Sequence, residues 1–310
     1  MQGLPEFEFA RSAPNRDGGT LRFMAFTVAC AQFAPQKAKV PENLDRIADL
    51  LLQSSGEGAD LVVFPETCTS GYFVEGGVAE VSLSAEKLEA ELTRRLAGRL
   101  NRHVDCVVGF YEQSEGTNFN SAAYLEFGPS HARTSHVYRK FFLPTYGVFD
   151  EQRFVGRGTA LGKVETRFGG VGILICEDVW HSLLGALLAM SGATLMVVPS
   201  ASPARDFSGE RIGNLDRYRR MLRALSEEHG VWSINCQLSG FEGGKGFVGG
   251  SLIVDPLGNV VAESPIQEDH ILLAQIDPEL GQIARANTPL FDDLRSNWCD
   301  LVEIARSLGP

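Results

Sequence analysis

Three residues with useful chemistry each lie at the end of a strand-like run. Glu66 ends LVVFPE, Lys140 lies within HVYRKFFLP, and Cys176 ends VGILIC. If these runs are strands of an α/β fold, their carboxyl ends are where such folds gather ligand groups. Glu66 could take the thiol proton as a general base and pass it to a leaving amine. Lys140 could stabilise a thiolate and a tetrahedral oxyanion, so the three residues predict a nucleophilic site.

Two acids directly follow the cysteine, and their charges oppose a thiolate. A carboxylate at about 4 Å disfavours a neighbouring thiolate by roughly 1 kcal/mol in water, and by more in a dry site. We therefore expect a tight turn after Cys176, from which the side chains of Glu177 and Asp178 diverge. Asp178 is expected to fix this turn by accepting hydrogen bonds from backbone N–H groups. The backbone N–H of Glu177 is the expected second oxyanion donor.

Each of these residues could also have a purely structural role. Cys176 alone would more often be a core thiol, and Glu66 could cap a turn at a strand end. Of the adjacent basic residues Arg139 and Lys140, one is expected to be solvated, and the FFLP context favours Lys140 as the inward one. The combination of the three motifs favours catalysis.

Other sites are disfavoured by spacing. His181 lies five residues after Cys176, which does not place its ring on the sulfur if 181–191 is helical. Metal ligation by Cys176, Glu177, Asp178 and His181 would need an irregular ligand spacing. The run GGKGFVGG lacks the GxxxxGK[ST] pattern of a phosphate loop and predicts a turn. We expect neither a metal nor an organic cofactor.

The elements that must position these residues alternate along the chain. Helical periodicity predicts helices over 41–59, 85–103, 183–191, 211–230 and 289–307. Apolar runs predict strands near 26–33, 61–64, 106–111, 122–127, 136–139, 171–175, 195–198, 231–237, 251–255 and 271–276. This pattern indicates one α/β domain whose sheets are covered by helices. We divide the chain into a flexible extension over 1–24, the domain over 25–280 and a helical tail over 281–310, which could lie at a subunit interface.

Composition limits the class of protein. The 310 residues are 44% hydrophobic and carry a net charge of −11, which argues against nucleic-acid or anionic-membrane binding. The six cysteines form no CxxC pair, a usage typical of a reduced compartment. The first 20 residues lack the apolar core of a signal peptide, and the apolar run 183–190 is too short to span a bilayer. We therefore expect a cytoplasmic protein.

The motifs around the three residues resemble those of the nitrilase, or carbon–nitrogen hydrolase, superfamily. FPE, RK-x-x-LP and CED occur in that order, and the resemblance runs from about Phe26 to Ile276. It implies a four-layer α-β-β-α sandwich and a homodimer or higher homo-oligomer. It also implies a Glu66–Lys140–Cys176 triad that works through a thioester. Glu151, eleven residues after Lys140, matches a second active-site glutamate that positions the lysine and binds the substrate nitrogen.

Longer sequence runs indicate which branch of the superfamily the chain resembles. KFFLPTYGVFDEQRF, ICEDVW, PSASPARDF and GFVGGSLIVDPLGNVVAESP look most like the glutaminase domain of glutamine-dependent NAD synthetases. The sequence ends at 310 without a nucleotide-binding synthetase domain, and CTSGYFVEGG after Glu66 looks like general amidases. We therefore expect a hydrolase that releases ammonia from a small ω-amide or N-carbamoyl compound.

Three alternatives are weighed beside this one. The chain could be an ammonia-donating glutaminase that is active only with a separate synthetase partner. A true nitrilase is less favoured, because Glu177 stands where those enzymes usually carry tryptophan. A cysteine peptidase is less favoured because no histidine has a fitting context. Arg205 or Arg211 could hold a substrate carboxylate in a bidentate pair. Loop residues expected near the pocket are Tyr72, Tyr146, Phe149, Ala201, Ser202 and Arg205. Of these, we expect Tyr72, Tyr146, Ala201 and Arg205 to bind substrate.

Overall fold

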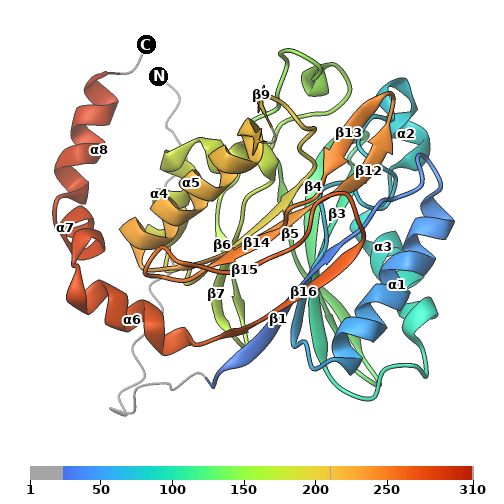
Figure 1. Ribbon diagram of the computed structural model, residues 1–310, viewed down its shortest axis with the longest axis horizontal. Helices are drawn as coiled ribbons and strands as arrows, with labels where there is room; N and C mark the ends of the chain where they lie inside the picture. The colour runs from blue at the N-terminus through green and yellow to red at the C-terminus, as the bar shows by residue number, and fades with distance from the viewer. Residues whose placement is uncertain (1–23, 210, 309–310) are drawn as a thin grey trace.

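The computed structural model, which describes residues 24–209 and 211–308, contains two six-stranded sheets packed face to face. Helices α1 (Val40–Gly56) and α3 (Ala85–Leu96) cover the outer face of one sheet. Helices α4 (Ser182–Met190) and α5 (Gly213–His229) cover the outer face of the other sheet (Figure 1). The expected four-layer α-β-β-α sandwich is confirmed.

The two sheets have similar mixed topologies. The first has the order β16 (His270–Ile276), β1 (Phe26–Gln32), β2 (Leu61–Val63), β3 (Val104–Ser114), β4 (Thr117–Phe127) and β5 (Ala132–Arg139). The second has the order β15 (Val260–Glu263), β14 (Leu252–Val254), β11 (Trp232–Gln237), β8 (Leu195–Ser200), β7 (Gly169–Ile173) and β6 (Lys163–Thr166). Two short hairpins, β9 (Phe207–Ser208) with β10 (Arg211–Ile212) and β12 (Ser239–Glu242) with β13 (Lys245–Val248), complete the strands of the described residues.

Strand β1 shows why its middle residues, 28–31, are all apolar. Val28 and Cys30 face the second sheet, whereas Ala29 and Ala31 face the helices, and all four are fully buried. Successive side chains of a strand point to opposite faces. A strand covered on both faces therefore reads as an apolar run rather than as an alternating one.

The strand directions bring the predicted site residues to one edge. β2 is parallel to β3, and β3 and β5 are both antiparallel to β4, so β5 runs in the same direction as β2. In the second sheet, β7 is parallel to β8. Glu66 and Lys140 follow β2 and β5, and Cys176 and Ala201 follow β7 and β8.

Several predicted boundaries were wrong. The helix expected over 85–103 ends at Leu96, and the chain then turns at Gly98, which has a φ of 72°. The helix expected from 211 begins at Gly213, because Arg211–Ile212 pairs with Phe207–Ser208 as a hairpin. The spacing of hydrophobic residues does not reveal where backbone pairing between two segments replaces a helix.

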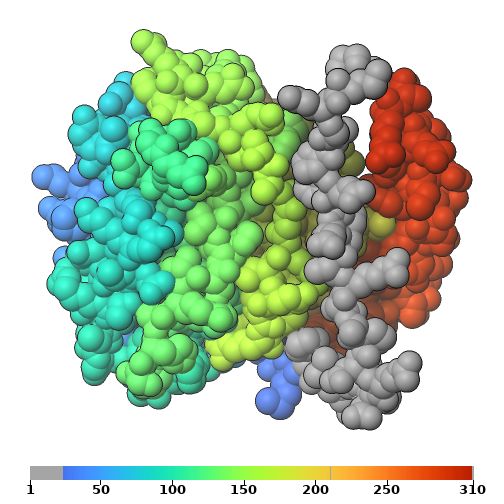
Figure 2. Space-filling view, turned by 180° about the vertical axis from the view of Figure 1, so that it is seen from behind, coloured from blue at the N-terminus to red at the C-terminus, as the bar shows by residue number. Residues whose placement is uncertain are grey.

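The end of the chain forms three helices where one was expected over 289–307. They are α6 (Pro278–Asn287), α7 (Leu290–Ser296) and α8 (Trp298–Ser307). They form one lateral edge of the molecule, opposite the side that carries α1 and α3 (Figures 1 and 2). The proposed boundary at 280/281 lies inside α6, and the proposed extension over 1–24 lies almost entirely outside the described residues. Short helix α2 (Val78–Val81) completes the described helices, each of which is too short or too polar to cross a bilayer.

Candidate active site

Glu66 lies at the carboxyl end of β2 and is completely buried. Its Oε1 accepts hydrogen bonds from Lys140 Nζ at 2.7 Å and from Asn120 Nδ2 at 2.8 Å. Its Oε2 accepts a hydrogen bond from the backbone N–H of Ala201 at 2.8 Å. Gly109 on β3 permits this placement, since a Cβ there would lie 2.7 Å from the Glu66 Cα. The carboxylate is thus held in one orientation by three donors from three different strands or strand ends.

Lys140 is also completely buried, and it bridges two carboxylates. Its Nζ lies 2.7 Å from Glu66 Oε1 and 2.6 Å from Glu151 Oε1. Although burial disfavours the ammonium, Glu151 and then Glu66 raise the pKa of Lys140 well above its usual value. Its neighbour Arg139 instead pairs with Glu112 and is partly exposed, so the prediction that Lys140 is the inward residue is confirmed.

Cys176 occupies a sharp turn at the end of β7. Its φ of 50° lies in the left-handed region, which is unusual for a residue with a side chain and marks local strain. Asp178 fixes this turn, as expected: its carboxylate accepts hydrogen bonds from the backbone N–H groups of Ile175 at 3.1 Å and of Phe142 at 2.8 Å. It also accepts one from the Tyr138 hydroxyl at 2.9 Å. Asp178 therefore uses its charge on the scaffold rather than on the sulfur.

The side chain of Glu177, the other acid, is directed to the surface of the site. Glu177 Oε2 accepts a hydrogen bond from the Tyr146 hydroxyl at 2.6 Å, and its Oε1 lies 3.8 Å from His181 Nε2. The ring of His181 stacks on Phe142 with a centroid distance of 3.6 Å. The acids after Cys176 thus diverge, which answers the electrostatic problem posed by the sequence.

The resting cysteine is a thiol. Burial, and then the Glu66 carboxylate, raise the pKa of Cys176, and these effects outweigh the lowering by Lys140, Tyr218 and the Ala201 N–H. Lys140 was expected to favour the thiolate, and it does, but two carboxylates already compensate its charge. Glu66 is the carboxylate whose charge acts most strongly on this sulfur.

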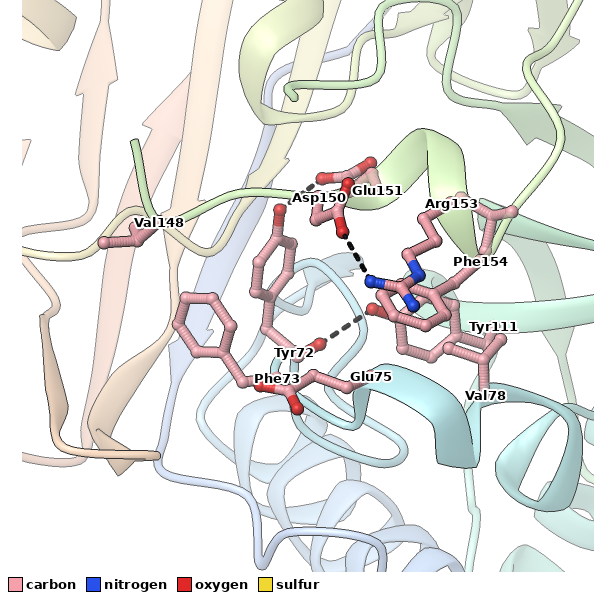
Figure 3. Close-up of a pocket in the computed structure, with 11 residues that line it drawn as sticks. Tyr72, Phe73, Glu75, Val78, Tyr111, Val148, Asp150, Glu151, Arg153 and Phe154 are labelled. Carbon is pink, nitrogen blue, oxygen red and sulfur yellow. Dashed lines mark hydrogen bonds and ion pairs between the residues drawn. The ribbon is translucent and has the colours of Figure 1, made fainter. Parts of the chain in front are cut away.

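Four residues were expected to contact substrate. Tyr72 is buried, and its hydroxyl donates to Glu151 (Figure 3). Ala201 is buried beside Glu66, and Tyr146 is 47% exposed. The guanidinium of Arg205 lies over the ring of Phe149, with its Cζ 4.9 Å from the ring centroid. Two of the four residues thus contact the buried carboxylates, Tyr72 at Glu151 and Ala201 at Glu66, whereas Tyr146 contacts Glu177.

A cavity of about 210 Å³ lies beside this site. Tyr72 and Glu151 form part of its wall, where the two side chains point toward each other (Figure 3). The Tyr111 hydroxyl donates to the Tyr72 carbonyl oxygen at 2.8 Å across the same wall. Cys176 is not part of this lining, so the cavity adjoins the site from the side of Glu151.

Sequence reasoning missed two residues. Asn120 Nδ2 donates to Glu66 at 2.8 Å and lies 3.4 Å from Glu151 Oε2, so it bridges both carboxylates. The Tyr218 hydroxyl lies 3.2 Å from Cys176 Sγ. Asn120 precedes the apolar run of β4 among other polar residues, so its contact with Glu66 left no clear signal in the sequence. Tyr218 fits the helical period of α5 and gave no signal beyond packing.

Replacing Glu151 by glutamine is expected to change how stability depends on pH. Burial, aided by Glu66 and opposed by Lys140, raises the pKa of Glu151 from 4.5 to about 7. Between these values the folded chain holds a proton that the unfolded chain releases, so this group stabilises the fold below pH 4.5 and loses that contribution as pH rises through 7. Urea unfolding from pH 4.5 to 8 should show wild-type stability falling relative to Glu151→Gln. Parallel curves for the two proteins would contradict this, and Glu165→Gln, on the exposed strand β6, is the control.

The arrangement combines a thiol, a fixed carboxylate, a buried ammonium and a second carboxyl group with a raised pKa. Such a set can form and break a bond to a carbonyl carbon while moving one proton. Among residues 24–209 and 211–308, no three or more histidine, cysteine or acidic side chains gather in a group that could hold a metal ion.

Comparison with known proteins gives a consistent result. Residues 27–286 match a family model described as carbon-nitrogen hydrolase. The glutamine-dependent NAD(+) synthetase of Thermotoga maritima is 30% identical over 257 residues, which cover 81% of this chain and 42% of that protein. The chain spans about half the length of the curated NAD synthetases that it matches.

Two further proteins match over nearly their full length. The 2-oxoglutaramate amidase of Bacillus subtilis is 25% identical over 274 residues, which cover 88% of this chain and 99% of that protein. A crystal structure of a carbon-nitrogen hydrolase from Helicobacter pylori G27 superposes with a TM-score of 0.79 at 24% identity. That superposition covers 90% of this chain and 98% of the solved one, and it supports the fold.

Proposed function

The chain belongs to the carbon–nitrogen hydrolase family, and we propose that it hydrolyses a small amide through Cys176 and releases ammonia. The observation that carries this proposal is the contact of one buried ammonium, Lys140, with two buried carboxylates, Glu66 at 2.7 Å and Glu151 at 2.6 Å. Burying one ammonium and two carboxylates costs desolvation energy. An ion pair that only stabilised the surface would not require this burial. Together with a strained cysteine on the adjoining strand end, the cluster supports nucleophilic catalysis.

In the proposed cycle, Cys176 Sγ forms a bond to the amide carbon while Glu66 accepts the thiol proton. The oxyanion that forms is stabilised by Lys140 and by the backbone N–H of Glu177. The C–N bond then breaks, and Glu66 gives its proton to the departing ammonia. Water attacks the thioester and gives one proton to Glu66, and the acid product leaves as the thiol is reprotonated. Glu151 holds Lys140 in place and accepts a hydrogen bond from the substrate nitrogen.

We propose that the substrate amide also carries a carboxylate. The Arg205 side chain lies over Phe149 and 5.7 Å from the Trp180 ring centroid, and its buried Nε has no hydrogen-bond partner among the described residues. Arg211, the other candidate, is 74% exposed and already pairs with Asp216 at 2.6 Å. We therefore assign the carboxylate of an ω-amide or N-carbamoyl compound to Arg205. The name of the Bacillus subtilis amidase, which indicates an ω-amide substrate, agrees with this class.

Arg205→Ala is expected to raise KM for carboxylate-bearing amides by about 10- to 100-fold, the effect of losing a hydrogen bond to a charged group. Simple aliphatic amides should show unchanged kcat/KM, because they offer no carboxylate. The measurement is steady-state ammonia release, with Arg211→Ala as the matched control. An equal loss on both substrate types would show that Arg205 does not select a carboxylate.

Ammonia release across a panel of amides tests the function. The panel holds glutamine, asparagine, ω-amides of keto acids, N-carbamoyl amino acids, aliphatic amides and a nitrile. We expect release from a carboxylate-bearing amide and none from the nitrile. Release from the nitrile alone would overturn the amidase assignment.

A second candidate function follows from the coverage of the relatives. Because the chain spans about half of each matched NAD synthetase, it could supply ammonia to a synthetase on another chain. In that case glutamine should be hydrolysed only after a synthetase is added. Turnover by the isolated chain at the same rate with and without a synthetase would exclude this function.

We also propose that the C-terminal helices contact a second subunit. In helix α8 no residue is buried, and its apolar residues Leu301 and Ile304 are 43% and 55% exposed. Sedimentation of the purified chain would report the oligomeric state directly.

A further inference from the structure

Helix α5 brings a tyrosine to the sulfur of the nucleophile. The Tyr218 hydroxyl lies 3.2 Å from Cys176 Sγ, and the tyrosine is completely buried. The two residues are 42 positions apart and belong to different elements, α5 and the turn after β7. We propose that Tyr218 is a further catalytic residue, whose O–H donates to the Cys176 sulfur as negative charge develops there. This inference rests on the proposed function, in which Cys176 is the nucleophile.

The surroundings of Tyr218 hold its hydroxyl in place. Its ring meets Trp180 edge to face, with centroids 5.5 Å apart, in the core between the second sheet and helices α4 and α5. The Ser200 hydroxyl, at the end of β8, forms a further interaction with the phenol. The hydroxyl therefore lies in a packed, water-poor environment with the sulfur as a direct partner at 3.2 Å.

The phenol keeps its proton throughout. Burial, and then the charge of Cys176, raise the pKa of Tyr218 well above its usual value, so the group stays protonated. A thiolate can only accept hydrogen bonds, so the contact with the phenol must run from O–H to sulfur once Cys176 is ionised.

A donor at the sulfur is needed because Lys140, the cation of the site, already pairs with two carboxylates. Lys140 is bound to Glu66 and Glu151, and burial keeps Cys176 protonated at rest. A neutral hydroxyl stabilises the developing thiolate without adding another buried charge. Tyr218 therefore lowers the free energy of the thiolate, while Lys140 and the Glu177 N–H are left to serve the substrate oxyanion.

The test is alkylation of Cys176 by iodoacetamide, followed by intact-protein mass spectrometry. Cys176 is 8% exposed and Cys30, Cys68, Cys106 and Cys236 are fully buried, so Cys299→Ser removes the remaining exposed thiol. In this background we expect Tyr218→Phe to slow alkylation at pH 8 about tenfold and to move the pH profile to higher pH. The expected loss of kcat is about 10- to 100-fold, the cost of removing a hydrogen bond to a charged group, with KM unchanged.

Tyr124→Phe is the matched control. This tyrosine is also completely buried, and its hydroxyl donates to Asp105 at 2.7 Å rather than to a residue of the site. Its loss should lower the melting temperature without changing alkylation. If Tyr218→Phe alkylates at the wild-type rate across the pH range, the inference is wrong and the tyrosine only fills the core.

Alkylation does not depend on any amide being a substrate. If the panel shows no amide hydrolysis but Tyr218→Phe shifts alkylation, the amidase proposal fails and the assignment of Tyr218 to the sulfur stands. If hydrolysis is found and alkylation is unchanged, only the assignment of Tyr218 fails.

Discussion

Cys176→Ala is expected to lower amide hydrolysis by at least about 10⁴-fold, as removal of a catalytic nucleophile does in other hydrolases. Every proposed bond change passes through its sulfur, and no other described thiol lies at this cluster. The fold should persist, because alanine keeps the Cβ, while Asp178 continues to hold the turn through its hydrogen bonds to Ile175 and Phe142.

The measurement is ammonia release by the variant, together with its circular dichroism spectrum and melting temperature. Cys299→Ser is the matched control, because this thiol is exposed on α8 and should be dispensable. If Cys176→Ala keeps more than a small fraction of wild-type turnover, Cys176 is not the nucleophile.

Lys140→Met is expected to remove activity and to destabilise the fold by about 3–5 kcal/mol, the range found when one partner of a buried ion pair is deleted. The substitution leaves Glu66 and Glu151 buried without their common cation. The loss should be smaller in acid, where the carboxyl groups take up protons instead of remaining charged.

A second substitution separates stability from activity. Lys140→Met combined with Glu151→Gln removes one of the two uncompensated charges, so it should regain part of the stability but none of the activity. Urea unfolding at pH 8 measures both variants. Lys163→Met is the control, because its exposed partner Glu165 makes this a surface pair worth less than about 1 kcal/mol. Unchanged stability of Lys140→Met would contradict the account of the buried cluster.

The sequence pattern was sufficient to predict an α/β domain and the meeting of Glu66, Lys140 and Cys176, and the resemblance of the motifs implied its four layers. These residues end strands, and strand direction alone brings such ends to one edge of a sheet. The role of Asp178 also followed from a local argument, because a thiol next to two acids requires that they be directed elsewhere.

The contacts of Tyr218 and Asn120 could not be predicted. Tyr218 occupies the inward face of α5, where a tyrosine that packs and a tyrosine that touches sulfur give the same periodicity. Asn120 reaches Glu66 only because β4 lies in the same sheet as β2 with β3 between them, a neighbour relation set by pairing rather than by composition. The break between α7 and α8 at Asn297 likewise leaves no clear signal in a helical period.

The most direct test of the central claim, a thioester on Cys176, is partition with hydroxylamine. The protein would be given an ω-amide and the methyl ester of the same acyl group, each with hydroxylamine present, and the hydroxamate and acid products would be measured. A common acyl-enzyme predicts the same hydroxamate-to-acid ratio from both substrates, because the leaving group has departed before water or hydroxylamine attacks. A ratio that depends on the leaving group, or acid formed with no hydroxamate, would contradict the thioester mechanism.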